Sequence, residues 1–173
     1  EFADFDADGD VDGYTANTSH FSLQSGRWWT NQGGIQGGTP GWYTDETSSR
    51  WVGLGGPGSS ILSNQVLPSG GFIDWCHDGE FGDLDDDGDL DLVHASYGPA
   101  FTGSVPTRLF LNDGSGHFSE FNPSGFQLPT VQMADTFPAI WAEGTQKTET
   151  FDTSGAFADV ASAANDVDLG DLD

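Results

Sequence analysis

Closely spaced aspartates are the residues of this sequence whose type and spacing could support chemistry. Residues 83–91 place an aspartate at positions 1, 3, 5, 7 and 9 of a nine-residue loop, and a glycine at position 6. Residues 4–12 repeat this pattern, and a third copy begins at residues 171–173. The candidate metal ligands are Asp4, Asp6, Asp8, Asp10 and Asp12 in the first loop, Asp83, Asp85, Asp87, Asp89 and Asp91 in the second, and Asp171 and Asp173 in the third.

The chemistry of these loops follows from the mutual repulsion of their carboxylates. Ionised side chains this close destabilise a loop that has no counter-charge, and a divalent cation supplies that charge. Ca²⁺ is the best match, because it takes about six to eight oxygen ligands and tolerates irregular geometry. The glycine at position 6 permits a sharp turn. A single such loop could be an acidic turn without an ion, but its recurrence in the same phase favours calcium sites.

The loops differ from the helix-flanked EF-hand type of calcium site. An EF-hand needs a bidentate glutamate at position 12 and a helix on each side. Position 12 is Thr15 in the first loop and His94 in the second, and residues 90–96 have no helical period. We therefore expect the ninth-position aspartates to close the metal shell and the seventh-position residues to bind through their backbone carbonyl groups.

The composition predicts an all-β fold with many turns. The 173 residues include 25 Gly, thirteen Phe, six Trp and three Tyr, a combination typical of strands and turns. The formal net charge is −24, from 28 acidic and four basic residues, which disfavours nucleic acid and anionic membrane surfaces as partners. No apolar run has the length of a membrane span, so membrane insertion is not expected. Cys76 is the single cysteine and cannot form an intrachain disulfide.

Two related units and the start of a third run along the sequence. The corresponding segments are 27–31 and 108–112, 41–45 and 116–120, and 78–83 and 166–171. The repeats span residues 1–77 and 78–165, and the third begins at residue 166. Each repeat is predicted to contain a strand, an acidic loop, two strands, a hairpin and a further strand. The Asn-Asp-Gly turn at residues 112–114 is a strong hairpin signal.

The acidic loop, the strand after it and the Asn-x-Gly-x-Gly-x-Phe hairpin together resemble the FG-GAP/VCBS repeats of integrin α-subunit-type propellers. The resemblance covers most of residues 1–173, with insertions at residues 31–41 and 122–150, but the Gly-Ala-Pro half of the family motif is missing. It implies one β-propeller segment with about two blades of four short antiparallel strands. By this resemblance the ligands are the aspartates at positions 1, 3, 5 and 9 and the carbonyl at position 7, while Asp86 faces solvent.

Other candidate chemistry in the sequence is weak. The histidines are scattered without the spacing of a zinc site, and no nucleophile elbow or phosphate-binding loop is present. Glu143 and Glu149 could form a carboxylate pair for glycoside cleavage, but nothing in the sequence sets their separation. Most Trp and Tyr side chains are expected in the core, and an exposed aromatic patch is the alternative. We therefore predict a protein that is not an enzyme.

These patterns together predict an extracellular or cell-surface module in which Ca²⁺ is a structural ion. Its expected role is adhesion, assembly or the binding of a protein or glycan ligand. The alternatives are a non-catalytic segment of a larger secreted enzyme and a subunit of a surface filament or polymer. Because propellers close with about four to eight blades, we expect a longer chain or neighbouring copies to complete the array. The insertion at residues 122–150 is expected to form a contact surface for a partner.

Overall fold

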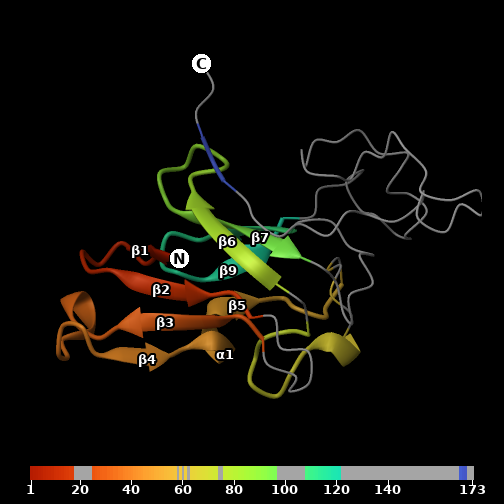
Figure 1. The fold of residues 1–173 in the computed structure, drawn as a ribbon, viewed down its shortest axis with the longest axis horizontal. Helices are drawn as coiled ribbons and strands as arrows, with labels where there is room; N and C mark the ends of the chain where they lie inside the picture. Colours follow the sequence, from red (N-terminus) through yellow and green to blue (C-terminus); the bar gives the residue numbers. More distant parts are fainter. Residues whose placement is uncertain are drawn as a thin grey trace, which may run out of the picture.

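The chain folds into two β-sheets with almost no helix (Figure 1). The computed structural model describes residues 1–17, 25–57, 59, 61, 63–73, 76–96, 108–121 and 168–170. This architecture confirms the predicted all-β class. In the described residues the sheets are not closed into a barrel or a propeller. No helix in this part of the chain is long and apolar enough to span a membrane.

The first sheet is an antiparallel meander whose strands follow chain order. It contains β1 (Phe2–Ala3), β2 (Asp12–Thr15), β3 (Arg27–Asn31) and β4 (Tyr43–Asp45). The first acidic loop connects β1 to β2, whose pairing of Ala3 with Asp12 fixes both ends of the loop. The loop is therefore held at one edge of the sheet.

The second sheet repeats this arrangement and adds one strand. It contains β6 (Cys76–Gly82), β7 (Asp91–Ser96), β8 (Arg108–Asn112) and β9 (Phe118–Glu120), and the short β5 (Trp51–Val52) pairs in parallel with β9. The second acidic loop connects β6 to β7, as the first loop connects β1 to β2. Corresponding segments of the two sequence units therefore occupy corresponding strands.

The structure adds to the expected element pattern at two places. Residues 76–82 contain two glycines and several charges, yet they form the strand before the second acidic loop, because β6 pairs with β7 up to that loop and is thereby held extended. Three single-turn helices also occur outside the strands in the described part of the chain. They are η1 (Gly34–Gln36), α1 (Thr47–Arg50) and η2 (Ser63–Gln65). The turn that follows β3 is thus longer and more structured than a hairpin.

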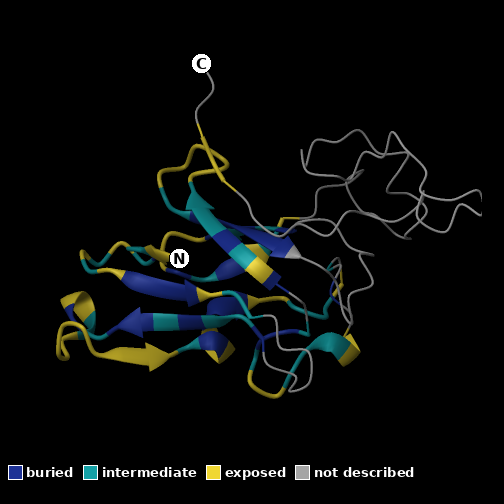
Figure 2. Cartoon of the chain, in the orientation of Figure 1, coloured by how far each residue is buried: buried dark blue, intermediate teal, exposed yellow. Residues whose placement is uncertain are grey.

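An aromatic core joins the two sheets, and much of β2 and β3 is buried, as the dark blue colour shows (Figure 2). Trp28 of β3 stacks on Phe118 of β9 with ring centroids 4.1 Å apart, and both side chains are fully buried. Phe5, inside the first acidic loop, packs edge-on against both rings. Such pairs each contribute about 0.5–1.5 kcal/mol beyond their buried area. The first loop is consequently anchored in the core that holds the sheets together.

Removal of the central ring should reduce stability far more than removal of an exposed one. Trp28→Ala should lower the free energy of unfolding by about 3–5 kcal/mol, because it leaves a cavity between the sheets. Trp42→Ala is the matched control, since Trp42 is 69% exposed, and should change it by less than about 0.5 kcal/mol. Urea unfolding followed by fluorescence measures both. Equal losses would contradict the assignment of Trp28 to the core.

Candidate metal centres

The first aspartate of each acidic loop accepts two corresponding backbone hydrogen bonds. The carboxylate of Asp4 accepts the backbone N–H groups of Asp8 and Gly9, each at 3.0 Å. In the second loop Asp83 accepts those of Asp87 at 3.1 Å and Gly88 at 3.0 Å. The first aspartate therefore organises each loop from within, in a way that needs only residues of the loop itself.

Left-handed backbone conformations give both loops their curvature. Gly9 and Gly88 have φ of 94° and 95°, a region that L-residues with a Cβ rarely adopt. Ala7 and Asp86, the fourth residues of the loops, also have positive φ, of 57° and 64°. Asp86 is exposed, as expected for a residue that is not a ligand. The shared turn geometry gathers the side chains at positions 1, 3 and 5 of each loop.

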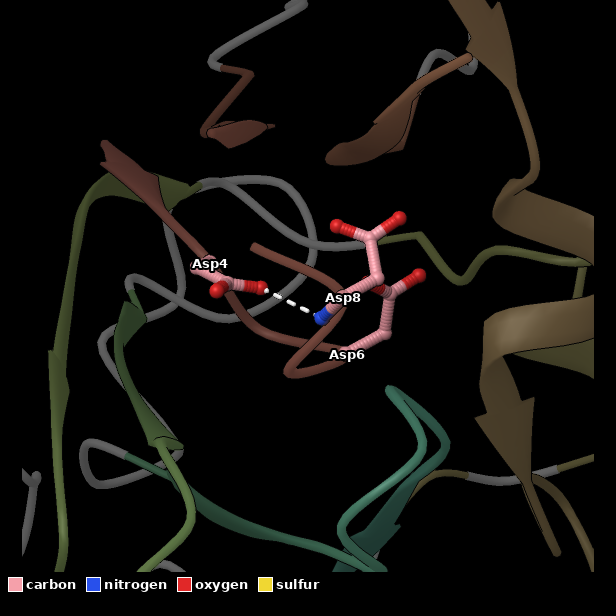
Figure 3. Close-up of side chains that lie close together, drawn as sticks. All are labelled: Asp4, Asp6 and Asp8. Carbon is pink, nitrogen blue, oxygen red and sulfur yellow. Dashed lines mark hydrogen bonds between the residues drawn. The ribbon is translucent and has the colours of Figure 1, made fainter. Parts of the chain in front are cut away.

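The aspartates at positions 1, 3 and 5 gather in each loop. Asp4, Asp6 and Asp8 each present a carboxylate oxygen within 4.8 Å of the other two (Figure 3). The corresponding oxygens of Asp83, Asp85 and Asp87 satisfy the same limit. Among the described residues, these are the two groups of acidic, His or Cys side chains close enough to hold a metal ion.

The ninth-position aspartates are buried. They tie the first loop to β3 and the second loop to β8. Both Asp12 and Asp91 are 0% exposed. Oδ1 of Asp12 accepts the backbone N–H of Asn31 at 2.8 Å, and Oδ1 of Asp91 accepts that of Asn112 at 2.8 Å. Oδ2 of Asp91 also accepts the backbone N–H of Leu84 at 2.8 Å. Both oxygens of Asp91 thus hold backbone groups, whereas Oδ2 of Asp12 has no hydrogen-bond partner.

Two asparagines that the sequence reading did not assign to the sites complete these anchors. The side-chain NH₂ of Asn31 donates to the carbonyl of Val11 at 3.1 Å, and that of Asn112 donates to the carbonyl of Leu90 at 3.0 Å. Their side-chain oxygens accept backbone N–H groups across the following turn. The signal that could have found them is their shared place at the start of the matching hairpins.

The first loop is covered, whereas the second is exposed. In the first loop Asp4, Asp6 and Asp8 are half-buried, while Asp83, Asp85 and Asp87 are exposed. Several carboxylate oxygens of the first loop are buried without a hydrogen-bond partner. They are Asp6 Oδ1, Asp8 Oδ2, both oxygens of Asp10 and Asp12 Oδ2. In the second loop Asp89 Oδ1 is the one such oxygen. The seventh-position side chain of the first loop therefore points inward and not to solvent.

Arg50 is a further charged residue of the first site that the sequence reading missed. Its Nη2 lies 3.0 Å from Oδ2 of Asp6 and 2.8 Å from a carboxylate oxygen of Glu46, and the side chain is 7% exposed. Its Nη1 donates to the carbonyls of Ser115 and Gly116 in the β8–β9 turn. The guanidinium neutralises one oxygen of Asp6 and links the first loop to the second sheet.

Burial and crowding raise the pKa of several carboxyls in the two loops. Burial is the main cause at Asp12, whose pKa rises to about 7 with a further contribution from the neighbouring aspartates. The same two causes raise the pKa of Asp6 and Asp10, and they raise that of Asp89 to about 6. A cation beside these buried, unpartnered oxygens would offset the cost of burial and the mutual repulsion that raise their pKa. The residues of the first loop therefore fit a hard divalent ion.

The remaining candidate residues do not add to these centres. Nδ1 of His94 is 2.9 Å from the hydroxyl of Tyr14 and 3.2 Å from Sγ of Cys76, and all three side chains are buried. This group belongs to the core between the sheets. Asp171 and Asp173 of the third loop, the insertion at residues 122–150, and Glu143 and Glu149 lie outside the described residues.

Comparison with known proteins leaves the geometry of the loops as the guide to function. No family model matches the sequence, and neither a curated protein nor a solved structure matches the chain. The likeness to FG-GAP/VCBS repeats therefore stays an interpretation of the loop and hairpin motifs.

In a chelator, the protein should become more stable when the pH falls from 7.5 to 5. Because the pKa of Asp12 is raised from 3.8 to about 7 in the folded state, the folded chain binds more protons than the unfolded chain between these values, and its stability falls as pH rises. Asp45 and Asp113 have lowered pKa values, so both stay ionised at pH 5 and do not offset the gain. Melting temperatures in chelator at the two pH values measure the effect.

Asp12→Asn is the matched variant, since it removes the titrating group and keeps an oxygen that can accept the N–H of Asn31. It should reduce the pH dependence, while the raised pKa of Asp89 leaves a part of it. A melting temperature that rises from pH 5 to 7.5 in the wild-type chain would contradict the raised pKa.

Proposed function

We propose that this chain is a calcium-binding β-repeat module that works outside the cell or at its surface, with Ca²⁺ as a structural ion. The observation that carries the proposal is the set of buried carboxylate oxygens in the first loop that have no hydrogen-bond partner. Burial of an ionised carboxylate without a partner costs several kcal/mol. A bound cation removes this cost, because each orphaned oxygen then has a ligand bond.

The choice of Ca²⁺ rests on the donor set and on the shape of the loops. The gathered side chains offer oxygen atoms only, which suits hard cations and disfavours zinc or copper. The loop geometry is irregular, and Ca²⁺ accepts irregular shells whereas Mg²⁺ demands a near-ideal octahedron. Extracellular calcium modules bind at about 10⁻⁴ to 10⁻³ M, which is the affinity range expected from the proposed location outside the cell.

We further propose that the two sheets are propeller-type blades of the FG-GAP/VCBS kind. In support, each sheet contains four antiparallel strands in chain order, and each acidic loop joins the first two of them. Aromatic side chains of both sheets share one core. Further repeats of a longer chain, or neighbouring copies, would extend the array on either side.

The proposed role is the presentation of a rigid surface to a protein or glycan ligand. The loop carboxylates hold backbone N–H groups of their own loops and strands, which favours a structural task over catalysis. Trp42 is 69% exposed, and the neighbouring Tyr43 donates its hydroxyl to the carbonyl of Val11 in the first loop at 2.8 Å. An aromatic surface beside a calcium loop suits sugar stacking or protein contact.

Calcium should stabilise the folded chain. At a hundredfold excess over Kd, each site should add about 2.7 kcal/mol to the free energy of unfolding, provided that the unfolded chain does not bind the ion. Calorimetry with Ca²⁺ and with excess EDTA measures the shift in melting temperature. An unchanged melting curve in EDTA would overturn the proposed function.

Paired variants of the second loop test the ligand register. Asp85→Ala removes one of the gathered carboxylates, and Asp86→Ala removes its exposed neighbour. Asp85→Ala should reduce the stabilisation by Ca²⁺ by up to one site's contribution, while Asp86→Ala should leave most of it. Equal losses would mean that the register of the ligands is wrong.

A further inference from the structure

The turn between β3 and β4 is longer than its counterpart in the second sheet. In the first sheet the side-chain oxygen of Asn31 accepts the backbone N–H of Gly41, ten residues along the chain. In the second sheet the equivalent bond joins Asn112 to Gly116, only four residues along. The additional residues of the first turn contain η1, and the turn lies at the same end of the sheet as the β1–β2 loop (Figure 1).

The backbone of this longer turn lies directly against the first loop. A Cβ at Gly33 would be 2.5 Å from Oδ2 of Asp10, and a Cβ at Gly34 would be 2.5 Å from Oδ2 of Asp8. Both carboxylate oxygens are buried without a hydrogen-bond partner. Residues 32–40 therefore cover two carboxylates of the first loop. Any side chain larger than that of glycine at position 33 or 34 would prevent this close contact.

Gln36, at the end of η1, reaches a third carboxylate. Its side-chain Nε2 donates to Oδ2 of Asp6 at 3.1 Å. The other end of the same amide, Oε1, is buried and has no hydrogen-bond partner. The amide group thus contacts the carboxylate group through its nitrogen and keeps an oxygen that lacks a donor. Amide oxygens are ordinary ligands of Ca²⁺. The orphaned Oδ1 of Asp6 has the same need.

The second loop has no equivalent cover in the described part of the chain. Its gathered carboxylates, Asp83, Asp85 and Asp87, are exposed. The short β8–β9 turn comes close to the seventh-position residue of the second loop, where a Cβ at Gly114 would be 3.2 Å from Oδ2 of Asp89. The two loops thus share one internal geometry but differ in what lies over them.

We propose that residues 32–40 form a lid that closes the first calcium site and supplies the side-chain oxygen of Gln36 as a ligand, whereas the second site is open. The inference rests on the proposed calcium binding. An additional oxygen ligand strengthens binding, and a lid must move before the ion can leave. The first site is therefore the tight, slowly exchanging one, and the second is the weaker one that exchanges freely with solvent.

Calcium titration and release on the full chain test the lid. Isothermal titration with Ca²⁺, after chelator treatment and dialysis, gives the affinities, and stopped-flow mixing of the loaded chain with a fluorescent chelator gives the dissociation rates. The wild-type chain should show one tight, slow class and one weak, fast class. Asp85→Ala should remove the weak class alone, which isolates the first site for the remaining variants.

Three variants in the Asp85→Ala background separate the ligand from the lid. Gln36→Ala should weaken the tight class by about tenfold or more and speed release, because the loss of even an outer contact commonly costs a metal site this much. Gln36→Glu keeps an oxygen at the same place and should stay closer to the parent. Replacement of residues 32–40 by the Asp-Gly-Ser of the second turn should bring affinity and release to the values of the second site in the wild-type chain.

The outcomes distinguish failure of the lid from failure of the proposed calcium binding. Two sites of equal affinity and release rate in the wild-type chain, or a tight class unchanged in Gln36→Ala, would overturn the lid while calcium binding stands. Absence of any calcium binding would overturn the proposed function itself. Near-ultraviolet circular dichroism checks that each variant is folded, and the two Gln36 variants decide the matter if the shortened turn fails to fold.

Discussion

The crowding of buried carboxylates in the first loop is the constraint on which the rest of the structure depends. Side chains of like charge are held a few ångströms apart, and backbone N–H groups satisfy only some of their oxygens. No protein donor reaches the others. A loop of this kind is stabilised by protonation of its carboxyls or by a positive charge inside it, and one guanidinium, that of Arg50, touches a single carboxylate of the cluster.

The same loop is also part of the junction between the sheets. Phe5 packs on Trp28 and Phe118, and its carbonyl accepts the side-chain NH₂ of Asn112 at 2.7 Å. Arg50 continues this contact, because it reaches both the loop and the β8–β9 turn. Electrostatic strain in the loop therefore acts on the aromatic core. A structural ion at this place would stabilise the contact between the sheets as well as the loop.

The two loops illustrate how one motif acquires two environments. The hydrogen bonds that Asp4 and Asp83 accept agree residue for residue, since these bonds join groups at most five positions apart. Their surroundings differ because the segments that lie over them differ. Phe5 is buried under the second sheet, whereas Leu84, at the same place in the second loop, is 36% exposed. The motif fixes the geometry of the ligands, and its neighbours fix the access of solvent.

The sequence by itself determined the class of the fold, most of the strands and the conformation of both loops, because these follow from signals within a few residues: alternating aspartates, a glycine that accepts positive φ, and Asn-Asp-Gly before a strand. It did not give the extent of β6, whose glycines and charges are held extended by pairing with β7. The tertiary structure alone decided the partners of Asp6. Gln36 and Arg50 lie 30 and 44 residues away in the chain, and contacts across such separations depend on how the sheets pack, which no local pattern encodes.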